Sequence, residues 1–411
     1  MNSILAPAAQ GAVARQLVQR SRDLIPALRA RAREAEKLRR LHPDTVADFI
    51  DAGILRVWQP RKYGGHEVDL LTGLETMQEV ARGCTSSAWC LTVYQQHNWI
   101  VSLFPGEAQD ECLGADNNAR VTAVLQPRGQ ARKVAGGYRL TGVWPFGSGS
   151  DHSTWIMLGG LVVDDSGREI KTERTVYGMP AVNARLCLIP SGEVKNRGDW
   201  DTAGLAATGS HTLEVNDLFV PEHRTLFIPD AIEKKAPGQQ INGSSIFRTP
   251  YYAFLNTALG GLAPGIAQGA LDAFLENIDT RMVPPINLPQ SKLIRTHRQI
   301  AEVATRIETA KLLFAANSER IMRAGETDTD MPLLERARCR LNTAWAVHQC
   351  YQAVETIFLA AGGSTLSMKH PIQRAMRDMH GVKAHYFMDL ETAQELFGMI
   401  QLGRAPFTYV F

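Results

Sequence analysis

The sequence lacks several features that would place it in a specialised class of protein. No apolar stretch reaches the roughly 18 residues that a membrane-spanning helix needs. The formal net charge is only +2, and the arginine-rich stretch at residues 29–40 is interleaved with Glu34 and Glu36. That pattern favours a solvated helix face over a nucleic-acid interface. We therefore expect neither a membrane nor a nucleic acid as a partner.

Cysteine pairs and targeting segments are also missing. The six cysteines form no CxxC pair and no cysteine–histidine cluster with zinc-ligand spacing. They are scattered among apolar neighbours, as reduced core cysteines usually are. Residues 1–7 carry no positive segment followed by an apolar one, so we expect no signal peptide. These absences predict a cytoplasmic protein without a metal site.

What is present is a change of pattern along the chain. Residues 8–113 have the periodic apolar pattern of helices, notably over 13–38. From about residue 118, some seven short strands are expected up to residue 222, with Gly136-Gly137 as a hairpin turn. Helices return after a linker at 234–245, over 256–278, 299–323, 332–361 and 371–402. The expected fold class is α+β, mostly α: an N-terminal helical domain (1–117), a central β-barrel or sandwich (118–235) and a C-terminal helical bundle (236–411).

Several motifs, in this order, resemble the acyl-CoA dehydrogenase fold. Pro60-Arg-Lys-Tyr63-Gly64-Gly65 is similar to its P-x-x-Y-G-G turn. The stretch from Trp200 to Ser210, followed by Val220-Pro221-Glu222, is similar to its W…G-x-x-x-T-G-S…V-P-E. The resemblance covers essentially the whole chain and implies a C-terminal four-helix bundle. It also implies that Gly362 and Gly363 lie beside a flavin, and that Arg281 reaches the flavin of a neighbouring subunit in a homotetramer.

The residues available for acid–base chemistry indicate oxygenation rather than dehydrogenation. Acyl-CoA dehydrogenases commonly carry a glutamate base in a late Tyr-Glu-Gly segment, and this sequence has no such segment. Instead it has Arg377-Asp378 followed by His385, which resembles the flavin-dependent monooxygenase branch of the fold. The stretch from Gly142 to Trp155 matches that branch's G-x-W-x-F-x-S-G-x-D-H-x-x-W. The branch includes the oxygenase components of 4-hydroxyphenylacetate 3-hydroxylase and of the steroid-degradation phenol hydroxylase.

The resemblance implies the oxygenase component of a two-component monooxygenase. A separate NAD(P)H:flavin reductase would supply reduced FMN or FAD as a co-substrate, with FMN favoured because no adenine site is recognised. Oxygen would add to the reduced flavin, and the resulting C4a-hydroperoxyflavin would hydroxylate an aromatic, phenolic substrate. The cofactor carries the oxygen chemistry, so the protein must orient it and exclude water.

Specific residues follow from that expectation. By resemblance, His385 lies near the peroxide and His97 near the substrate, where a neutral imidazole can accept the phenolic proton. Ser148 is expected to place its hydroxyl near flavin N5. Trp89 and Phe146 are expected as flavin walls, whereas Trp144 is either a flavin wall or part of the barrel core.

Other functions stay open at this point. Related proteins oxygenate amine nitrogen or sulfur with the same set of residues. An acyl-CoA dehydrogenase with a displaced base would need another carboxylate, for which Glu308 and Asp272 are candidates. A non-enzymatic flavin-binding protein would have no need of His97, Ser148 and His385.

Overall fold

The N-terminal part of the chain is helical, as predicted. The computed structural model describes residues 11–411, so residues 1–7 and the first predicted helical residues, 8–10, lie outside the described residues. The helix predicted over 13–38 is two helices that meet at Leu24, because Pro26 in the first turn of the second has no N–H to continue the ladder. The helices are α1 (Ala12–Asp23), α2 (Ile25–Leu38), α3 (Pro43–Asp51), α4 (Leu70–Gly83), α5 (Thr85–Val101) and α6 (Gly106–Gln109).

The central part forms one seven-stranded sheet. Its order is β7-β8-β2-β1-β3-β6-β9, and every pair is antiparallel except β1 with β3. The predicted hairpin is confirmed, since Val134 pairs with Gly137 across the turn. The last strand lies beyond the predicted end at residue 222. The strands are β1 (Val121–Val134), β2 (Gly137–Gly147), β3 (Trp155–Val163), β6 (Ala184–Pro190), β7 (Lys195–Asn196), β8 (His211–Pro221) and β9 (Thr225–Phe227).

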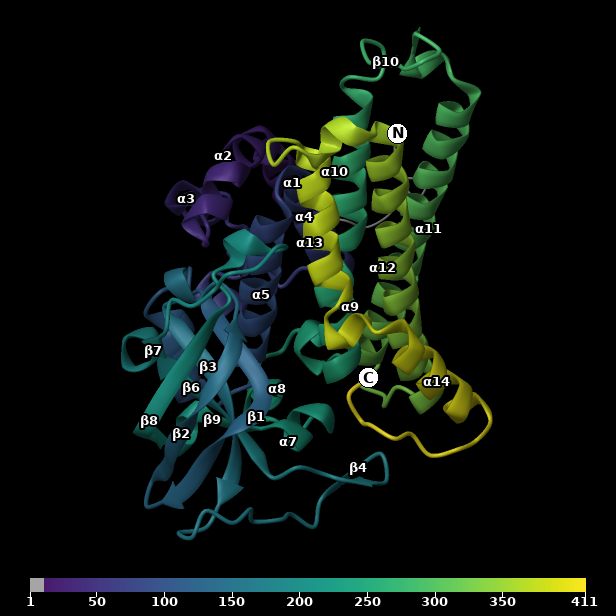
Figure 1. Ribbon diagram of the computed structural model, residues 1–411. Helices are drawn as coiled ribbons and strands as arrows, with labels where there is room; N and C mark the ends of the chain where they lie inside the picture. The colour runs from purple at the N-terminus through teal and green to yellow at the C-terminus, as the bar shows by residue number, and fades with distance from the viewer. Residues whose placement is uncertain (1–10) are drawn as a thin grey trace.

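The sheet curls around its own core. β6 and β8 contact each other although three strands separate them in the ladder. The enclosed apolar cluster includes Trp144, Leu158 and Leu213, all fully buried. This is the barrel-like arrangement expected from the sequence. A separate two-stranded ribbon, β4 (Thr175–Val176) with β5 (Met179–Pro180), extends away from it toward the bundle (Figure 1).

Helices return after the sheet. Helices α10 to α13 contact one another as a four-helix bundle, which Figure 1 shows in green and yellow beside the sheet. The prediction of one long helix over 371–402 is wrong. The chain leaves the helical conformation after α13, and His385 caps a short 3₁₀ turn. The predicted 256–278 helix is likewise divided. The elements are α7 (Ile228–Ile232), α8 (Pro237–Ile241), α9 (Tyr251–Gly260), α10 (Ala263–Leu275), β10 (Met282–Val283), β11 (Leu288–Pro289), α11 (Ile294–Glu326), α12 (Leu333–Ala361), α13 (Pro371–Lys383) and α14 (Leu390–Gln401).

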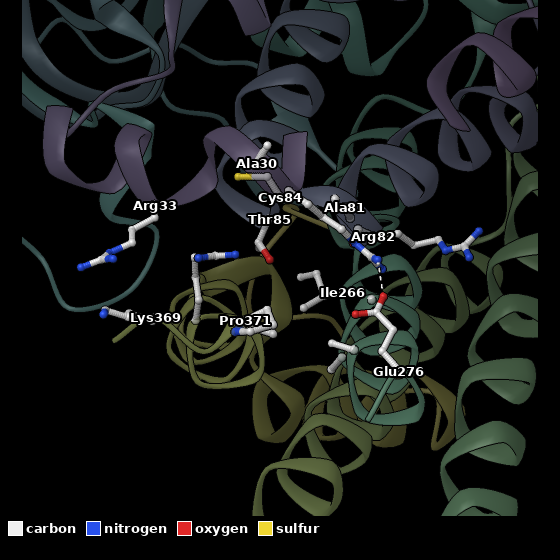
Figure 2. Close-up of a pocket in the computed structure, with 17 residues that line it drawn as sticks. Ala30, Arg33, Ala81, Arg82, Cys84, Thr85, Ile266, Glu276, Lys369 and Pro371 are labelled. Atoms are coloured by element: carbon white, nitrogen blue, oxygen red, sulfur yellow. Dashed lines mark hydrogen bonds and ion pairs between the residues drawn. The ribbon is translucent and has the colours of Figure 1, made fainter. Parts of the chain in front are cut away.

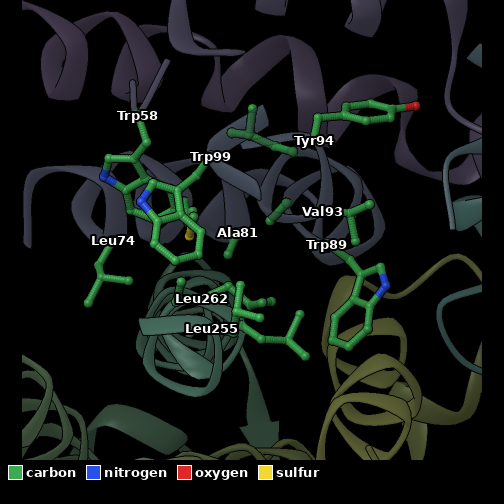
Figure 3. Packing of buried hydrophobic residues seen from close by; sticks show 14 of the residues in the cluster. Trp58, Leu74, Ala81, Trp89, Val93, Tyr94, Trp99, Leu255 and Leu262 are labelled. Carbon is green, nitrogen blue, oxygen red and sulfur yellow. The ribbon is translucent and has the colours of Figure 1, made fainter. Parts of the chain in front are cut away.

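Helix α5 joins the three parts. All 17 of its residues are buried, and it contacts α4, α9 and β1. Trp99 stacks on Phe254 with ring centroids 4.1 Å apart, and Trp58 meets the same ring edge-on at 4.8 Å. Figure 3 shows Trp58 and Trp99 side by side, with Trp89 apart from them. A helix packed on every side is a rigid support for a functional site.

None of the helices in the described part of the chain combines the length and apolar content needed to cross a membrane.

Candidate active site

His97 is fixed on α5 in a defined tautomer. Its Nδ1 lies 2.8 Å from the carbonyl oxygen of Val121, at the start of β1. Since a carbonyl can only accept, Nδ1 carries the proton and Nε2 keeps a free lone pair. Burial lowers the pKa of His97 to about 4, although the Val121 carbonyl opposes that shift. The side chain is therefore neutral at pH 7 and presents one hydrogen-bond acceptor.

Ser148 stands at the centre of a buried hydrogen-bond chain. The indole N–H of Trp89 donates to its hydroxyl at 3.1 Å, and the Ser148 and Ser210 hydroxyls share a hydrogen bond of 2.8 Å. Thr208 continues the chain with a 2.6 Å bond to Ser210. The next residue, Gly149, has φ +75°, and a Cβ there would lie 2.5 Å from the Tyr94 hydroxyl. The turn therefore needs glycine after Ser148, and that turn aims the serine at Trp89.

His385 meets this chain from the C-terminal bundle. Its ring packs edge-on against Trp89, with centroids 5.8 Å apart. Its Nδ1 accepts the backbone N–H of Phe387 at 3.2 Å, so the neutral ring carries its proton on Nε2. Burial lowers the pKa of His385 to about 4. His385 is therefore a neutral donor, the complement of the neutral acceptor at His97.

The first strand of the sheet links the two halves of the site. His97 bonds the carbonyl of Val121, and the hydroxyl of the next residue, Thr122, donates to the Ser148 carbonyl at 2.6 Å. His97 lies two helical turns from Trp89 on α5, about 12 Å along the axis at 1.5 Å per residue. Trp89, Ser148 and His385 thus form one cluster, and His97 flanks it.

Sequence reasoning assigned no role to Ser210 or to Asp378. Asp378 is fully buried on α13 and accepts the backbone N–H of Leu205 at 2.7 Å. Burial raises its pKa to about 7. The neighbouring Arg377 donates to the Ala203 carbonyl, so two residues of α13 hydrogen-bond the loop that leads to Ser210. Ser210 lies in the T-G-S segment and Asp378 in the R-D segment of the family motifs. The sequence alone does not show their contacts, because these form only when distant segments fold together.

Trp144 and Phe146 lie away from the cluster. Trp144 is fully buried inside the sheet, where its indole N–H donates to the Gly159 carbonyl at 2.8 Å. Of the two alternatives for Trp144, the structure thus has the barrel core, and no face of its ring is left for a flavin. Phe146 is 66 % exposed, and its ring meets Trp200 edge-on at 6.1 Å. Neither ring contacts Trp89 or His385.

The remaining predicted flavin residues gather elsewhere. Arg281 lies beside Gly362, since a Cβ on that glycine would be 2.5 Å from the guanidinium. Arg281 precedes β10, at the top of Figure 1, and α13 runs down from that end toward α14. His385 follows α13, whose 13 residues span about 20 Å at 1.5 Å per residue. Arg281, Gly362 and Gly363 are therefore separated from Trp89 and Ser148 within one chain.

One side-chain group in the described residues has metal-ligand geometry: Glu107, Glu111 and His223. His223 and Arg224 already contact the two carboxylate oxygens of Glu111. Ion pairing accounts for this group, and it carries no part of the site.

The donors in the Trp89 cluster suit a flavin ring. They are neutral at pH 7 and include hydroxyl, indole and imidazole groups, as a largely apolar ring with a few polar edges requires. Arg281, beside Gly362, carries the kind of charge that binds a flavin phosphate.

Comparison with known proteins identifies the family. The model of the acyl-CoA dehydrogenase N-terminal domain matches residues 13–111, and that of the C-terminal domain matches residues 257–390. The oxygenase subunit HsaA of a flavin-dependent monooxygenase from Rhodococcus jostii is 30% identical over 94% of this chain and 98% of its own length. The chain belongs to the flavin-dependent monooxygenases of the acyl-CoA dehydrogenase fold.

Two further relatives agree with this placement of the oxygenase. The oxygenase component of p-hydroxyphenylacetate 3-hydroxylase from Acinetobacter baumannii is 26% identical over 95% of this chain and 90% of its own. The solved structure of XiaF from a Streptomyces species, in complex with FADH2 and glycerol, matches with a TM-score of 0.89 at 27% identity. It covers 96% of this chain and 97% of the XiaF chain. The expected family, fold and enzyme class are confirmed.

Proposed function

We propose that this monooxygenase takes reduced flavin from a separate NAD(P)H:flavin reductase and hydroxylates an aromatic, phenolic substrate. The observation that carries the proposal is the pair of neutral histidines around the Trp89–Ser148 contact. The p-hydroxyphenylacetate relative, and a second relative named as an FADH2-dependent resorcinol hydroxylase, support a phenolic substrate. Reduced flavin, when bound, supplies the activation of oxygen.

The chain's own residues have separate tasks in this proposal. His97 offers the lone pair of Nε2, which can accept the hydrogen bond or proton of a phenol and make its ring more electron-rich. His385 offers an Nε2–H that can donate to a developing oxygen anion. Ser148, held by Trp89 and Ser210, presents a hydroxyl of fixed position to the flavin edge. The burial of α5 keeps bulk water away from these groups.

The separation of the two groups of flavin residues supports a flavin site that is shared between subunits. Arg281 and Gly362 lie at the opposite end of α13 from His385 in the same chain. A flavin bound at the Trp89 cluster of one subunit could therefore meet Arg281 of another subunit. We propose that the oxygenase is a homotetramer whose flavin sites are completed between subunits, with Trp89, Ser148 and His385 from one chain.

We also propose FMN as the preferred flavin and the cytoplasm as the compartment. FMN remains the preferred flavin by the sequence argument, and the XiaF complex makes FAD the form to compare with it. All six cysteines are buried and free, as expected of a protein kept in the reducing cytoplasm.

The dehydrogenase alternative receives no support from the two candidate carboxylates. Asp272 forms an ion pair with Arg82 at 2.9 Å. Glu308 lies on α11, which carries none of the site residues. The catalytic base of an acyl-CoA dehydrogenase would have to face the flavin, and neither carboxylate lies in the Trp89 cluster.

The test is a coupled assay with a panel of phenols. Protein, a flavin reductase, NADH, FMN or FAD, and each phenol are mixed in air, and the products are analysed by mass spectrometry. The proposal predicts a product heavier by one oxygen atom, which comes from labelled O₂. Oxidation of an amine or a thiophene in the same assay, with all phenols unchanged, would contradict the phenolic substrate but leave the monooxygenase class intact.

A further inference from the structure

A cavity lies outside the site described above. It has a volume of about 380 Å³ and is lined by α2, the junction of α4 and α5, α10 and the start of α13. Figure 2 shows Arg33 and Lys369 at one side, Arg82 and Glu276 at the other, and Thr85 between them. Its volume lies in the lower part of the ~300–1,000 Å³ range of small-molecule sites.

The charges around this cavity are unbalanced. Five cationic side chains and a single carboxylate line it: Arg29, Arg33, Arg82, Lys369 and Arg374, with Glu276. Arg29 pairs with Glu276 at 2.8 Å, and Arg82 pairs with Asp272 and Glu79, each at 2.9 Å. Two of the five cations are therefore neutralised by neighbouring carboxylates.

Arg374 is the exceptional member. Its residue is only 9 % exposed, yet its guanidinium has no hydrogen bond or ion pair with any residue in the part of the chain that the structure describes. Asp378, one turn further along α13, accepts the Leu205 N–H; burial raises the pKa of this carboxyl, and the charge of Arg374 opposes that shift without a hydrogen bond between the two side chains. None of the side-chain nitrogens of Arg374 is among the fully enclosed, unpaired atoms of the described residues, so the guanidinium reaches water in the cavity, where a bound anion can take the place of that water. Arg374 is therefore a largely buried cation whose head group is open to an anion in this cavity.

Other groups at the same wall suit an anion. Arg33 and Lys369 likewise have no side-chain ion pair among residues 11–411. Thr85 lines the cavity and begins α5, a helix of 17 residues, so the positive end of the helix dipole and a hydroxyl lie there. The rest of the lining is small and apolar, including Ala81, Ile266 and Ala270.

We propose that this cavity is a binding site for an organic phosphate monoester. The phosphate would lie against Arg374, Arg33 and Lys369, since a dianion matches three uncompensated cations better than a carboxylate does. The organic part would lie on the apolar wall, because a phosphate alone fills little of the volume. The site is independent of the proposed oxygenation, since none of the Trp89 cluster lines it.

Isothermal titration calorimetry tests the site with three probes: inorganic phosphate, glycerol 3-phosphate and glycerol. We expect one glycerol 3-phosphate per chain, weaker binding of inorganic phosphate, and no binding of glycerol. Arg374→Gln should weaken glycerol 3-phosphate binding at least tenfold. Arg128→Gln, an exposed arginine on β1, is the matched control and should bind like wild type. No binding by the wild type, or equal binding by the Arg374→Gln variant, overturns the proposal.

A second variant covers the case in which Arg374→Gln does not fold. Arg33 and Lys369 are exposed or nearly so, hence their replacement leaves the core intact. The double variant Arg33→Gln, Lys369→Gln should also weaken glycerol 3-phosphate binding several-fold. Unchanged affinity in this double variant contradicts a phosphate bound at this wall. Binding of inorganic phosphate alone, without glycerol 3-phosphate, contradicts the monoester.

Discussion

The indole N–H of Trp89 donates to the hydroxyl of Ser148 across 3.1 Å, joining α5 to the end of β2. The same indole ring packs edge-on against His385, which follows α13. One tryptophan therefore connects residues from all three parts of the fold. The relationship explains why residues 59 and 296 positions away from it in the sequence can act on one ligand.

Replacing Ser148 by alanine should uncouple the reaction. The Trp89 N–H loses its acceptor and the Ser210 hydroxyl loses a hydrogen-bond partner. The side chains beside the flavin then rearrange or keep polar groups without a partner. We expect less hydroxylated product and more hydrogen peroxide per NADH consumed. A peroxide assay alongside product analysis measures this ratio. Ser166→Ala, on an exposed loop, is the control and should keep the wild-type ratio.

His385→Ala should uncouple turnover more strongly, because it removes the Nε2–H donor and the edge of the Trp89 contact. Flavin oxidation should continue and yield peroxide without product. The control is His380→Ala: this exposed histidine lies on α13 and contacts Met376 and Tyr351. If both variants couple as wild type does, His385 has no role in the chemistry.

The stability of the protein should fall when the pH is lowered from about 6.5 toward 4. His97 and His385 have pKa values near 4 when folded, compared with about 6.5 when unfolded. The unfolded chain therefore binds more protons in this interval, and acid favours unfolding. At about 1.4 kcal/mol per pKa unit, the lowered pKa of each histidine reduces the free energy of unfolding in acid by up to about 3 kcal/mol.

Thermal unfolding at pH 7 and pH 5 measures this effect. The double variant His97→Gln, His385→Gln should lose less of its melting temperature between the two pH values than wild type. Asp378 acts in the opposite direction, since its raised pKa favours the folded state at lower pH, but it is present in both proteins. An equal acid shift in the two proteins would mean that the histidines titrate normally.

Gly204→Ala should be strongly destabilising. A Cβ at this position would lie 2.1 Å from the carbonyl oxygen of Arg377, a backbone atom that cannot move aside without shifting α13. A cost of about 2 kcal/mol or more is expected, as for other strained or overpacked sites. Gly192→Ala is the matched control, because nothing lies within 4 Å of its Cβ position. Similar melting temperatures for the two variants would contradict the close packing of this loop on α13.

Much of the fold could be predicted from local pattern. The hairpin at Gly136-Gly137 follows from turn chemistry, and the change from helical to β periodicity near residue 118 follows from side-chain alternation. The break at His385 could not be predicted in this way, since it depends on that side chain capping the next turn. The apolar pattern continues into α14 and hides the break.

The site was only partly predictable for a similar reason. The motif around Ser148 indicated the serine and its turn, but the partners Trp89 and Ser210 are 59 and 62 residues away. Trp144 and Phe146 belong to the same motif, yet one lies in the barrel core and the other is exposed. Strand alternation and the left-handed backbone at Phe146 decide which way each ring points, and a motif match does not determine that.

The most direct test of the account is a stopped-flow experiment with reduced flavin. The purified protein is mixed anaerobically with an equimolar amount of reduced FMN or FAD, then with oxygenated buffer, and flavin absorbance and released peroxide are followed together. The protein is expected to slow the release of peroxide relative to buffer, and with an accepted phenol the hydroxylated product is expected to replace peroxide. Reoxidation of the flavin at the rate and with the peroxide yield seen in buffer would contradict the account.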